Sequence, residues 1–187
     1  MNIVKTTKKS ILAKNFKIQE LESDIIKLIP LTEFDFERLY EVASDPLIWE
    51  QHPSRDRYKR EIFEKYFIGA SLSNTAFIII DKLTNKVIGS TRFYDYKPEK
   101  PSIAIGYTFL ARSYWGGHYN HSVKKVLLDY AFEFVDKVYF HIGPTNIRSQ
   151  KATMKIGAIK VGEFNLDSNG QKVMHFEYLI EKKDWRF

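Results

Sequence analysis

Apolar side chains follow two kinds of spacing along this chain. They alternate with polar residues or form short apolar runs, as strands do, over residues 16–21, 25–31, 76–81, 87–96, 102–110, 138–142, 158–166 and 172–180. They recur every three or four residues, as on one face of a helix, over residues 32–45, 57–72, 119–135 and 147–156. Residues 84–86 and 168–170 are typical of hairpin turns. This order predicts an α/β (α+β) domain with a twisted, mixed and mostly antiparallel sheet flanked by helices on both faces.

Length and charge divide the chain into two unequal parts. Its 187 residues suit one domain, which we place at residues 16–187. Residues 1–15 form a basic N-terminal extension, because residues 1–20 hold five lysines against Glu20 and so carry most of the net charge of +6. Such a tail is usually a solvated segment, and binding to nucleic acid or to a membrane surface is the minority interpretation.

What the composition lacks excludes several classes of protein. There is no cysteine, which rules out disulfides, thiolate metal sites and a thiol nucleophile. The five histidines are scattered along the chain, so no metal site is predicted. No apolar run approaches the roughly 20 residues that span a bilayer, and the first residues lack the apolar core of a secretion signal. We therefore expect a cytoplasmic protein without a membrane segment.

Two adjacent glycines, Gly116 and Gly117, stand between a predicted strand and a predicted helix. Because they carry no side chain, they allow the backbone to approach a ligand closely. The free N–H groups and the dipole at the start of the following helix attract anions. The segment lacks the spacing of a Walker loop and of the dinucleotide-binding fingerprint, and glycine pairs also occur in plain turns. A pyrophosphate cradle is therefore one of two interpretations of this pair.

A basic helix face follows later in the chain. Arg148, Lys151 and Lys155 recur at spacings that place them on one side of the predicted helix, and residues 141–160 contain no carboxylate. An ordinary solvated helix face could have the same composition. Close to a loop that attracts anions, however, the unpaired cations favour a polyanionic ligand.

These two stretches carry sequence motifs. Residues 114–120 read Y-W-G-G-H-Y-N, and the later stretch contains Asn146, Arg148, Ser149, Lys155 and Gly157 at the spacing N-x-R-S-x-x-x-x-x-K-x-G. Together they resemble the GNAT superfamily of acyl-CoA-dependent N-acetyltransferases, most closely its RimJ/RimL-like branch, which includes ribosomal-protein N-terminal acetyltransferases. The likeness extends over residues 16–181. It implies a GNAT-type domain over residues 16–187 that uses acetyl-CoA.

The resemblance also implies which residues contact acetyl-CoA. The pantetheine arm would pair with the backbone of a strand edge that a splayed neighbour leaves open, at Thr108, Phe109 and Leu110. The pyrophosphate would be held by backbone N–H groups of Trp115, Gly116, Gly117, His118, Tyr119 and Asn120. The pantetheine would also bind the side chain of Asn146, and the 3′-phosphate or adenine end would meet Arg148, Lys151 or Lys155.

The implied reaction transfers an acetyl group to a primary amine, on a protein N-terminus or on a small molecule. Since the chain has no cysteine, we expect direct attack in a ternary complex. Ser149 is the candidate for protonating or hydrogen-bonding the leaving sulfur, although it could simply cap its helix. His141 and His175 are candidate bases, with Glu177 and Glu163 as carboxylate alternatives. A satisfied core histidine, or a water chain without a dedicated base, remains the competing interpretation.

Several positions depart from the family pattern. Ser113 and His118 replace the usual loop residues, Ala104 stands where many relatives have a catalytic glutamate, and Thr153 stands where others have a tyrosine acid. These departures leave a second interpretation open, a non-catalytic domain that binds or senses acyl-CoA. The basic tail and the 28 aromatic residues motivate a third, an RNA- or ribosome-associated module, although nucleic-acid binding is not expected.

The segment between the first two predicted helices usually helps to shape the acceptor pocket in this family. Here it contains Trp49, His52, Arg55 and Arg57. Its cations hint at an acceptor that carries a carboxylate or a phosphate, although neighbouring acidic residues dilute that hint. The expected partner is a small-molecule or peptide amine, with no membrane and no metal, and the sequence leaves a homodimer open.

Overall fold

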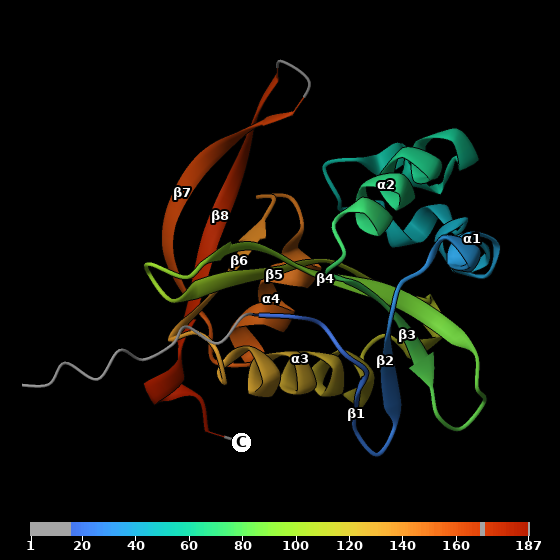
Figure 1. The fold of residues 1–187 in the computed structure, drawn as a ribbon. Coiled ribbons are helices and arrows are strands. Elements are labelled where there is room, and N and C mark those ends of the chain that lie inside the picture. The colour runs from blue at the N-terminus through green and yellow to red at the C-terminus, as the bar shows by residue number, and fades with distance from the viewer. Residues whose placement is uncertain (1–15, 169–170, 187) are drawn as a thin grey trace, which may run out of the picture.

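The computed structural model describes residues 16–168 and 171–186, and its strands form one sheet in the order β1-β2-β3-β4-β5-β6-β8-β7 (Figure 1). The strands are β1 Leu21–Glu22, β2 Ile26–Pro30, β3 Ala76–Asp81, β4 Val87–Lys97, β5 Ser102–Leu110, β6 Lys137–Ile142, β7 Ile159–Ser168 and β8 Gln171–Glu181. The helices are α1 Phe36–Ala43, α2 Arg60–Leu72, α3 His118–Ala131 and α4 Ile147–Lys155. Neighbouring strands run antiparallel except β5 and β6, which are parallel. The predicted mixed and mostly antiparallel sheet is confirmed.

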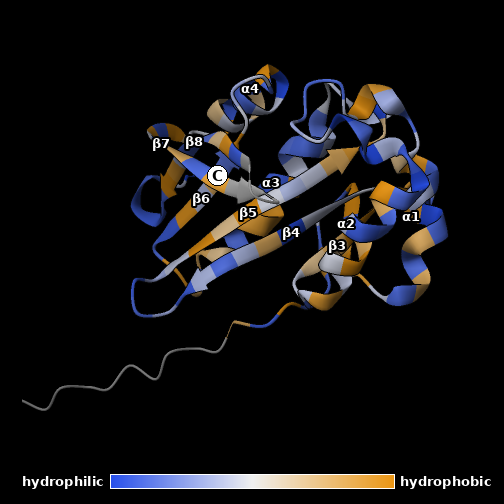
Figure 2. Cartoon of the chain, turned by 90° about the horizontal axis from the view of Figure 1, so that it is seen from above, coloured by the Kyte–Doolittle hydropathy of each residue, from blue (hydrophilic) through white to orange (hydrophobic). Residues whose placement is uncertain are grey.

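Helices cover both faces of the sheet, as predicted. In Figure 1, α3 lies below the sheet, whereas α1 and α2 lie above it. Phe93 and Leu127 are fully buried in the core that includes α3, and Leu39 and Phe63 are fully buried in a second core under α1 and α2. Along these helices hydrophilic and hydrophobic positions alternate (Figure 2), because only one face of each helix packs on the sheet.

Most predicted elements are confirmed, with ends that shift by a few residues. The strands predicted over 76–81 and 102–110 begin and end where predicted. The strand predicted over 16–21 is wrong, because only β1 pairs with β2 there. Phe16 instead packs its ring against Phe93 and Phe134, at centroid distances of 5.1 and 5.4 Å. The predicted extension at residues 1–15 and the tip of the predicted turn at 169–170 lie outside the described residues.

β5 separates from β6 partway along its length. Parallel pairing extends from Ser102 to Ala104 on β5, opposite Lys137 to Tyr139 on β6, and then ends. The rest of β5, up to Leu110, has no strand partner on that side among the described residues. The open strand edge that the resemblance implied is therefore present.

A β-bulge in β5 lies beside this opening. One residue of β4, Thr91, faces two residues of β5, Tyr107 and Thr108, and Tyr107 takes a left-handed φ of 54°. Successive side chains of a strand point to opposite faces of the sheet, and these two do so here. Tyr107 packs against Tyr66 of α2, whereas Thr108 accepts a hydrogen bond from Lys124 of α3.

Candidate functional site

A cleft of about 640 Å³ opens where β5 and β6 separate. Its walls come from these two strands, the loop before α3, the starts of α3 and α4, and the segment after α1. Most of the residues predicted from the sequence line it: Thr108, Phe109, Leu110, Trp115, Gly116, Gly117, Asn120, His141, Asn146, Arg148, Ser149, Lys151, Lys155 and His175. His118 and Tyr119 do not line it, although their backbone belongs to the first turn of α3.

The glycine loop presents bare backbone at the start of α3. Gly116 has a φ of +73°, a left-handed conformation that favours glycine, and no atom lies within 4 Å of where its Cβ would be. Gly117 occupies the cap position, where no side chain takes the first N–H groups of the helix. Behind the loop, the hydroxyls of Tyr114 and Tyr119 donate to the buried carboxylate of Asp81. The loop is thus anchored from behind and open to an anion in front.

Contacts of Trp115 and Arg148 connect the segments that line the cleft. The indole N–H of Trp115 donates to the Leu110 carbonyl at 2.9 Å. The Arg148 guanidinium lies 3.8 Å from the Trp115 ring, donates to the Ile48 carbonyl at 2.9 Å and pairs with Glu50 at 3.4 Å. Burial lowers the pKa of Arg148, but an arginine stays charged. The Arg148 guanidinium is therefore already occupied by contacts within the protein.

The other two cations on this face of α4, Lys151 and Lys155, make no such contacts with the described residues. Lys151 and Lys155 line the cleft, and neither makes an ion pair with any residue that the structure describes. Unpaired ammonium groups at the rim of a cleft can neutralise an anionic ligand. Of the three predicted cations, the two lysines are therefore the ones available to a phosphate.

Asn146 caps α4, and Ser149 is the residue that it caps. The Asn146 Oδ1 accepts a hydrogen bond from the Ser149 N–H at 3.2 Å. The Ser149 hydroxyl lines the cleft and has no partner among the described residues. The capping role thus uses the backbone of Ser149 and leaves its hydroxyl for a ligand.

Lys124 is a cleft residue to which the sequence analysis assigned no role. It is only 6% exposed, and its Nζ donates to Thr108 Oγ1 at 2.8 Å. Burial lowers its pKa to about 7, since no carboxylate of the described residues lies close enough to oppose the effect. The sequence signal that could have found it is a lysine on the same helix face as the buried Val123 and Leu127.

Two of the predicted catalytic residues, His141 and His175, differ in their hydrogen bonds. His141 Nδ1 lies 2.9 Å from the Tyr94 hydroxyl, and its Nε2 lies 3.4 Å from Glu177. Burial lowers the pKa of His141, while Glu177 works in the opposite direction. Both nitrogens of this ring are engaged, which matches the satisfied histidine of the competing interpretation. Tyr94 was not predicted, because no sequence pattern links it to a histidine on another strand.

One ring nitrogen of His175 has no hydrogen-bond partner in the part of the chain that the structure describes. Its Nδ1 lies 3.0 Å from the Val173 carbonyl, so this nitrogen carries the proton and donates it. The lone pair of the neutral ring is then on Nε2, and the residue lines the cleft. His175 is therefore the better placed of the two histidines to accept a proton.

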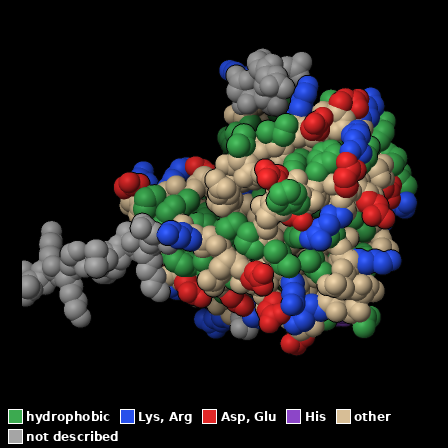
Figure 3. All heavy atoms as spheres, turned by 45° about the vertical axis from the view of Figure 1, so that its right-hand side comes forward, with side chains coloured by type: hydrophobic (Ala, Val, Ile, Leu, Met, Phe, Trp, Pro, Cys, Tyr) green, Lys and Arg blue, Asp and Glu red, His purple; other side chains and the backbone are tan. Residues whose placement is uncertain are grey.

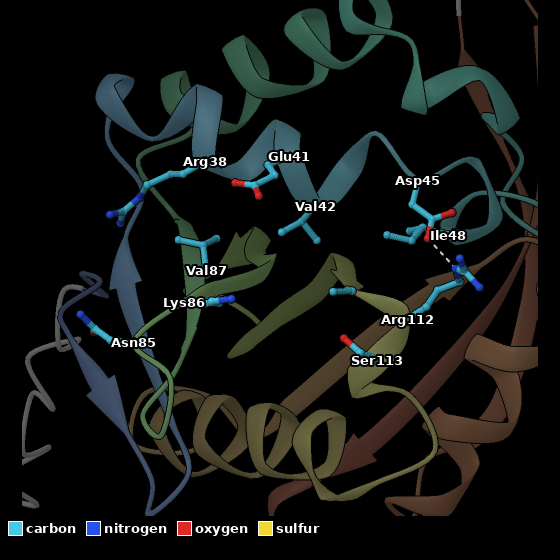
Figure 4. A pocket seen from close by; sticks show the side chains of 11 residues that line it. Arg38, Glu41, Val42, Asp45, Ile48, Asn85, Lys86, Val87, Arg112 and Ser113 are labelled. Carbon is cyan, nitrogen blue, oxygen red and sulfur yellow. Dashed lines mark hydrogen bonds and ion pairs between the residues drawn. The ribbon is translucent and has the colours of Figure 1, made fainter.

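A second hollow, of about 880 Å³, lies between α1 and the β3–β4 turn (Figure 4). Arg112 pairs there with Asp45 across its edge, as the dashed line in Figure 4 shows. Arg38 pairs with Asp35, and no histidine lines the hollow. None of the predicted catalytic residues Ser149, His141 and His175 lines this hollow, whereas all three line the cleft at β5.

Charges on the face that carries α1 and α2 are mixed, with basic and acidic side chains interspersed (Figure 3). Among the described residues, no group of three or more histidine, aspartate or glutamate side chains is placed to hold a metal ion. No helix in the described part of the chain combines the length and the apolar character needed to cross a bilayer.

Solved structures share this fold over most of the chain. A GCN5-related N-acetyltransferase from Brucella melitensis has a TM-score of 0.80 at 18% identity, with 92% of this chain and 82% of that chain covered. An acetyltransferase (GNAT family) from Bacillus anthracis has a TM-score of 0.73 at 18% identity, covering 88% and 99%. Mycobacterium smegmatis RimJ in complex with CoA-disulfide has a TM-score of 0.65 at 16% identity, covering 89% and 87%. At these identities, the likeness shows the fold alone.

The sequence adds a family assignment to the shared fold. The family model described as the acetyltransferase (GNAT) domain matches residues 26–159, a range that runs from β2 through α4 and includes the glycine loop. This match covers well over half of the chain and the cleft-lining segments of β5, β6 and α3. The chain therefore belongs to the acetyltransferase (GNAT) domain family.

Proposed function

We propose that this protein transfers an acetyl group from acetyl-CoA to a primary amine, on a protein N-terminus or a small molecule, by direct attack in a ternary complex. The observation that carries the proposal is one cleft that combines an unpaired strand edge on β5 with the uncapped start of α3. An extended amide-bearing chain can pair with the first feature, and a pyrophosphate can bind the second.

The residues present fit acetyl-CoA, which would supply an activated acyl group as a thioester. The unpaired backbone from Thr108 to Leu110 would hold the pantetheine arm, and the N–H groups from Trp115 to Asn120 would hold the pyrophosphate. Lys151 and Lys155 would meet the remaining phosphate. The Leu110 carbonyl already accepts from Trp115, so this carbonyl contributes only with its second lone pair.

On the acceptor side, this chain has to remove a proton and exclude competing water. An amine is nucleophilic only when neutral, so a base must hold the released proton. We assign this role to His175 Nε2, which is free, while the Tyr94–His141–Glu177 chain orders the same wall of the cleft. The free Ser149 hydroxyl is assigned to the leaving sulfur, as a hydrogen-bond donor.

We also propose a family branch, domain bounds and a location for this protein. The RimJ/RimL-like branch is supported by the Y-W-G motif at residues 114–116 and by the fold that the chain shares with RimJ. A domain over residues 16–187 encloses the matched residues 26–159. A cytoplasmic location is inferred from the lack of cysteine in the sequence.

A thermal shift with acetyl-CoA tests the cofactor, with ATP and inorganic phosphate as controls. At 100-fold over Kd, the ligand adds about 2.7 kcal/mol, which raises the melting temperature of a chain of this size by roughly 5–10 °C. Release of the CoA thiol with a panel of amines then tests transfer. A shift without thiol release from any amine would favour a binding or sensing domain, and no shift would reject the cofactor.

A further inference from the structure

Arg57 is a half-buried cation without an anion. It belongs to the 3₁₀ turn Arg55–Tyr58 and lines the cleft above β5. Its guanidinium carbon lies 4.7 Å from the Tyr66 ring centroid and 5.1 Å from the Trp49 ring centroid. Among the described residues, no carboxylate lies within ion-pair distance of it. Burial accordingly lowers the pKa of Arg57, and the nearby Arg92 lowers it further.

His52 presents a second donor to the same place. Its Nδ1 accepts the Ser54 backbone N–H at 2.9 Å, so Nδ1 carries the lone pair. The neutral ring then has its proton on Nε2, and this nitrogen lies 3.3 Å from Arg57 Nη1. Burial, followed by the charge of Arg57, lowers the pKa of His52 to about 3, which keeps the ring neutral. Two N–H donors therefore meet with no acceptor between them.

This unmatched pair lies close to the bulge of β5. The Tyr66 ring that packs under Arg57 donates its hydroxyl to the Tyr107 carbonyl at 3.0 Å. One tyrosine side chain thus separates the Arg57 guanidinium from the strand edge where the acyl group is expected. An acceptor that reaches both places needs its amine and its anionic group only a few bonds apart.

We propose that Arg57 and His52 form a carboxylate-binding subsite, and that the acceptor is a small amine bearing a carboxylate near the amine, as in an amino acid. This inference rests on the proposed function. One guanidinium and one neutral imidazole supply a single positive charge and two converging donors, which match a monoanion with two acceptor oxygens. The rings of Trp49 and Tyr66, which contact the guanidinium, lower the local dielectric constant and so strengthen such a pair.

The first test compares matched acceptors. The common amino acids are assayed by thiol release beside their amides, which keep the amine and lose the negative charge. We expect kcat/KM to fall at least tenfold from acid to amide, which is about 1.4 kcal/mol of lost binding. Arg57→Gln should raise KM for the acids and leave the amides unchanged, with partial rescue in Arg57→Lys. Lys65→Gln removes an exposed charge of α2 and should change kcat/KM for neither the acids nor the amides.

The second test does not depend on turnover. Sodium acetate is titrated into the CoA-bound protein while the side-chain nitrogens of the histidines are followed by NMR, with sodium chloride and sodium phosphate as controls. We expect acetate to shift the His52 Nε2 signal in the wild type and not in Arg57→Gln. No acetate shift, a stronger response to phosphate, or equal use of acids and amides would overturn the carboxylate subsite. Failure of acetyl-CoA to bind would instead reject the function on which it rests.

Discussion

The ammonium group of Lys124 donates to the Thr108 hydroxyl at 2.8 Å, and that hydroxyl lies 2.8 Å from the hydroxyl of Thr91. This short chain ties α3 to the bulged part of β5 in the wall of the cleft. Burying an amine without a carboxylate costs stability, because the charge loses its hydration. A site that keeps such a group is one where function and stability compete.

Replacing this amine should stabilise the protein. The folded-state pKa of Lys124, about 7, lies below the ordinary 10.5, so between these values the unfolded chain binds a proton that the folded chain lacks. The stability of the wild type therefore rises with pH across this window. Lys124→Met should add about 2 kcal/mol at or below neutral pH, and the gain should shrink toward pH 10. Calorimetry at three pH values measures this.

A matched control for that substitution is Lys125→Met. Lys125 is exposed and pairs with Asp129 one turn away, so its loss should give no pH-dependent gain. A loss of stability in Lys124→Met at every pH would mean that the hydrogen bond to Thr108 outweighs the burial cost.

Substitutions of His175 and His141 should differ in their effects on kcat and on the melting temperature. His175→Gln removes the free Nε2 and is expected to lower kcat by about 100-fold, because the proton of the amine then has no base to accept it. His141→Gln breaks contacts with Tyr94 and Glu177, and should lower the melting temperature with a smaller effect on kcat. The rate of thiol release at saturating substrates, measured beside the melting temperature, distinguishes the two variants. Wild-type kcat in His175→Gln would remove this residue as the base.

Gly116→Val should weaken acetyl-CoA binding through backbone strain. A valine at a φ of +73° costs about 1–2 kcal/mol, and the loop would relieve this by moving. Since nothing lies within 4 Å of the added Cβ, a steric clash is not the cause. We expect at least a tenfold higher Kd by calorimetric titration. Gly69→Ala on α2 is the control and should keep the wild-type Kd.

The order of elements could be predicted from the sequence because each has its own periodicity. Short, mostly apolar runs delimited β3 and β5 correctly, since each has well-defined flanking turns. It failed at residues 16–21, where Phe16 is apolar because it fills a gap between Phe93 and Phe134. An apolar residue that packs as a single anchor has no period, so its pattern resembles that of a short strand.

The candidate site was predictable only where chemistry and motif coincide. The glycine loop and the start of α4 carry such motifs, and both line the cleft. The bulge at Tyr107 has no such signal, yet its one extra residue reverses the face of the sheet that the later residues of β5 reach. The partners of His141 and the donor pair at Arg57 depend on register between distant strands and turns, which a single sequence does not reveal.

Substitutions of the three α4 cations should differ in how they change the Kd of acetyl-CoA relative to that of its 3′-dephospho form. Lys151→Gln or Lys155→Gln should raise the Kd of acetyl-CoA about fivefold and leave that of dephospho-acetyl-CoA unchanged, as expected for a lysine that meets this phosphate. Arg148→Gln should weaken both ligands equally and lower the melting temperature, because Arg148 holds Ile48 and Trp115. A phosphate-specific loss in Arg148→Gln alone would restore it as the phosphate ligand.

Ser149→Ala tests whether the free hydroxyl acts on the reaction or only occupies the first turn of α4. The substitution leaves the Ser149 N–H on Asn146 Oδ1, so the cap and the fold should persist. We expect kcat to fall about tenfold, which is the loss of one hydrogen bond made as the thiol leaves, while the Kd of acetyl-CoA stays the same. Ser149→Thr keeps a hydroxyl and should retain part of the rate. Wild-type kcat in Ser149→Ala, measured at saturating acetyl-CoA and acceptor, would reduce Ser149 to a helix-start residue.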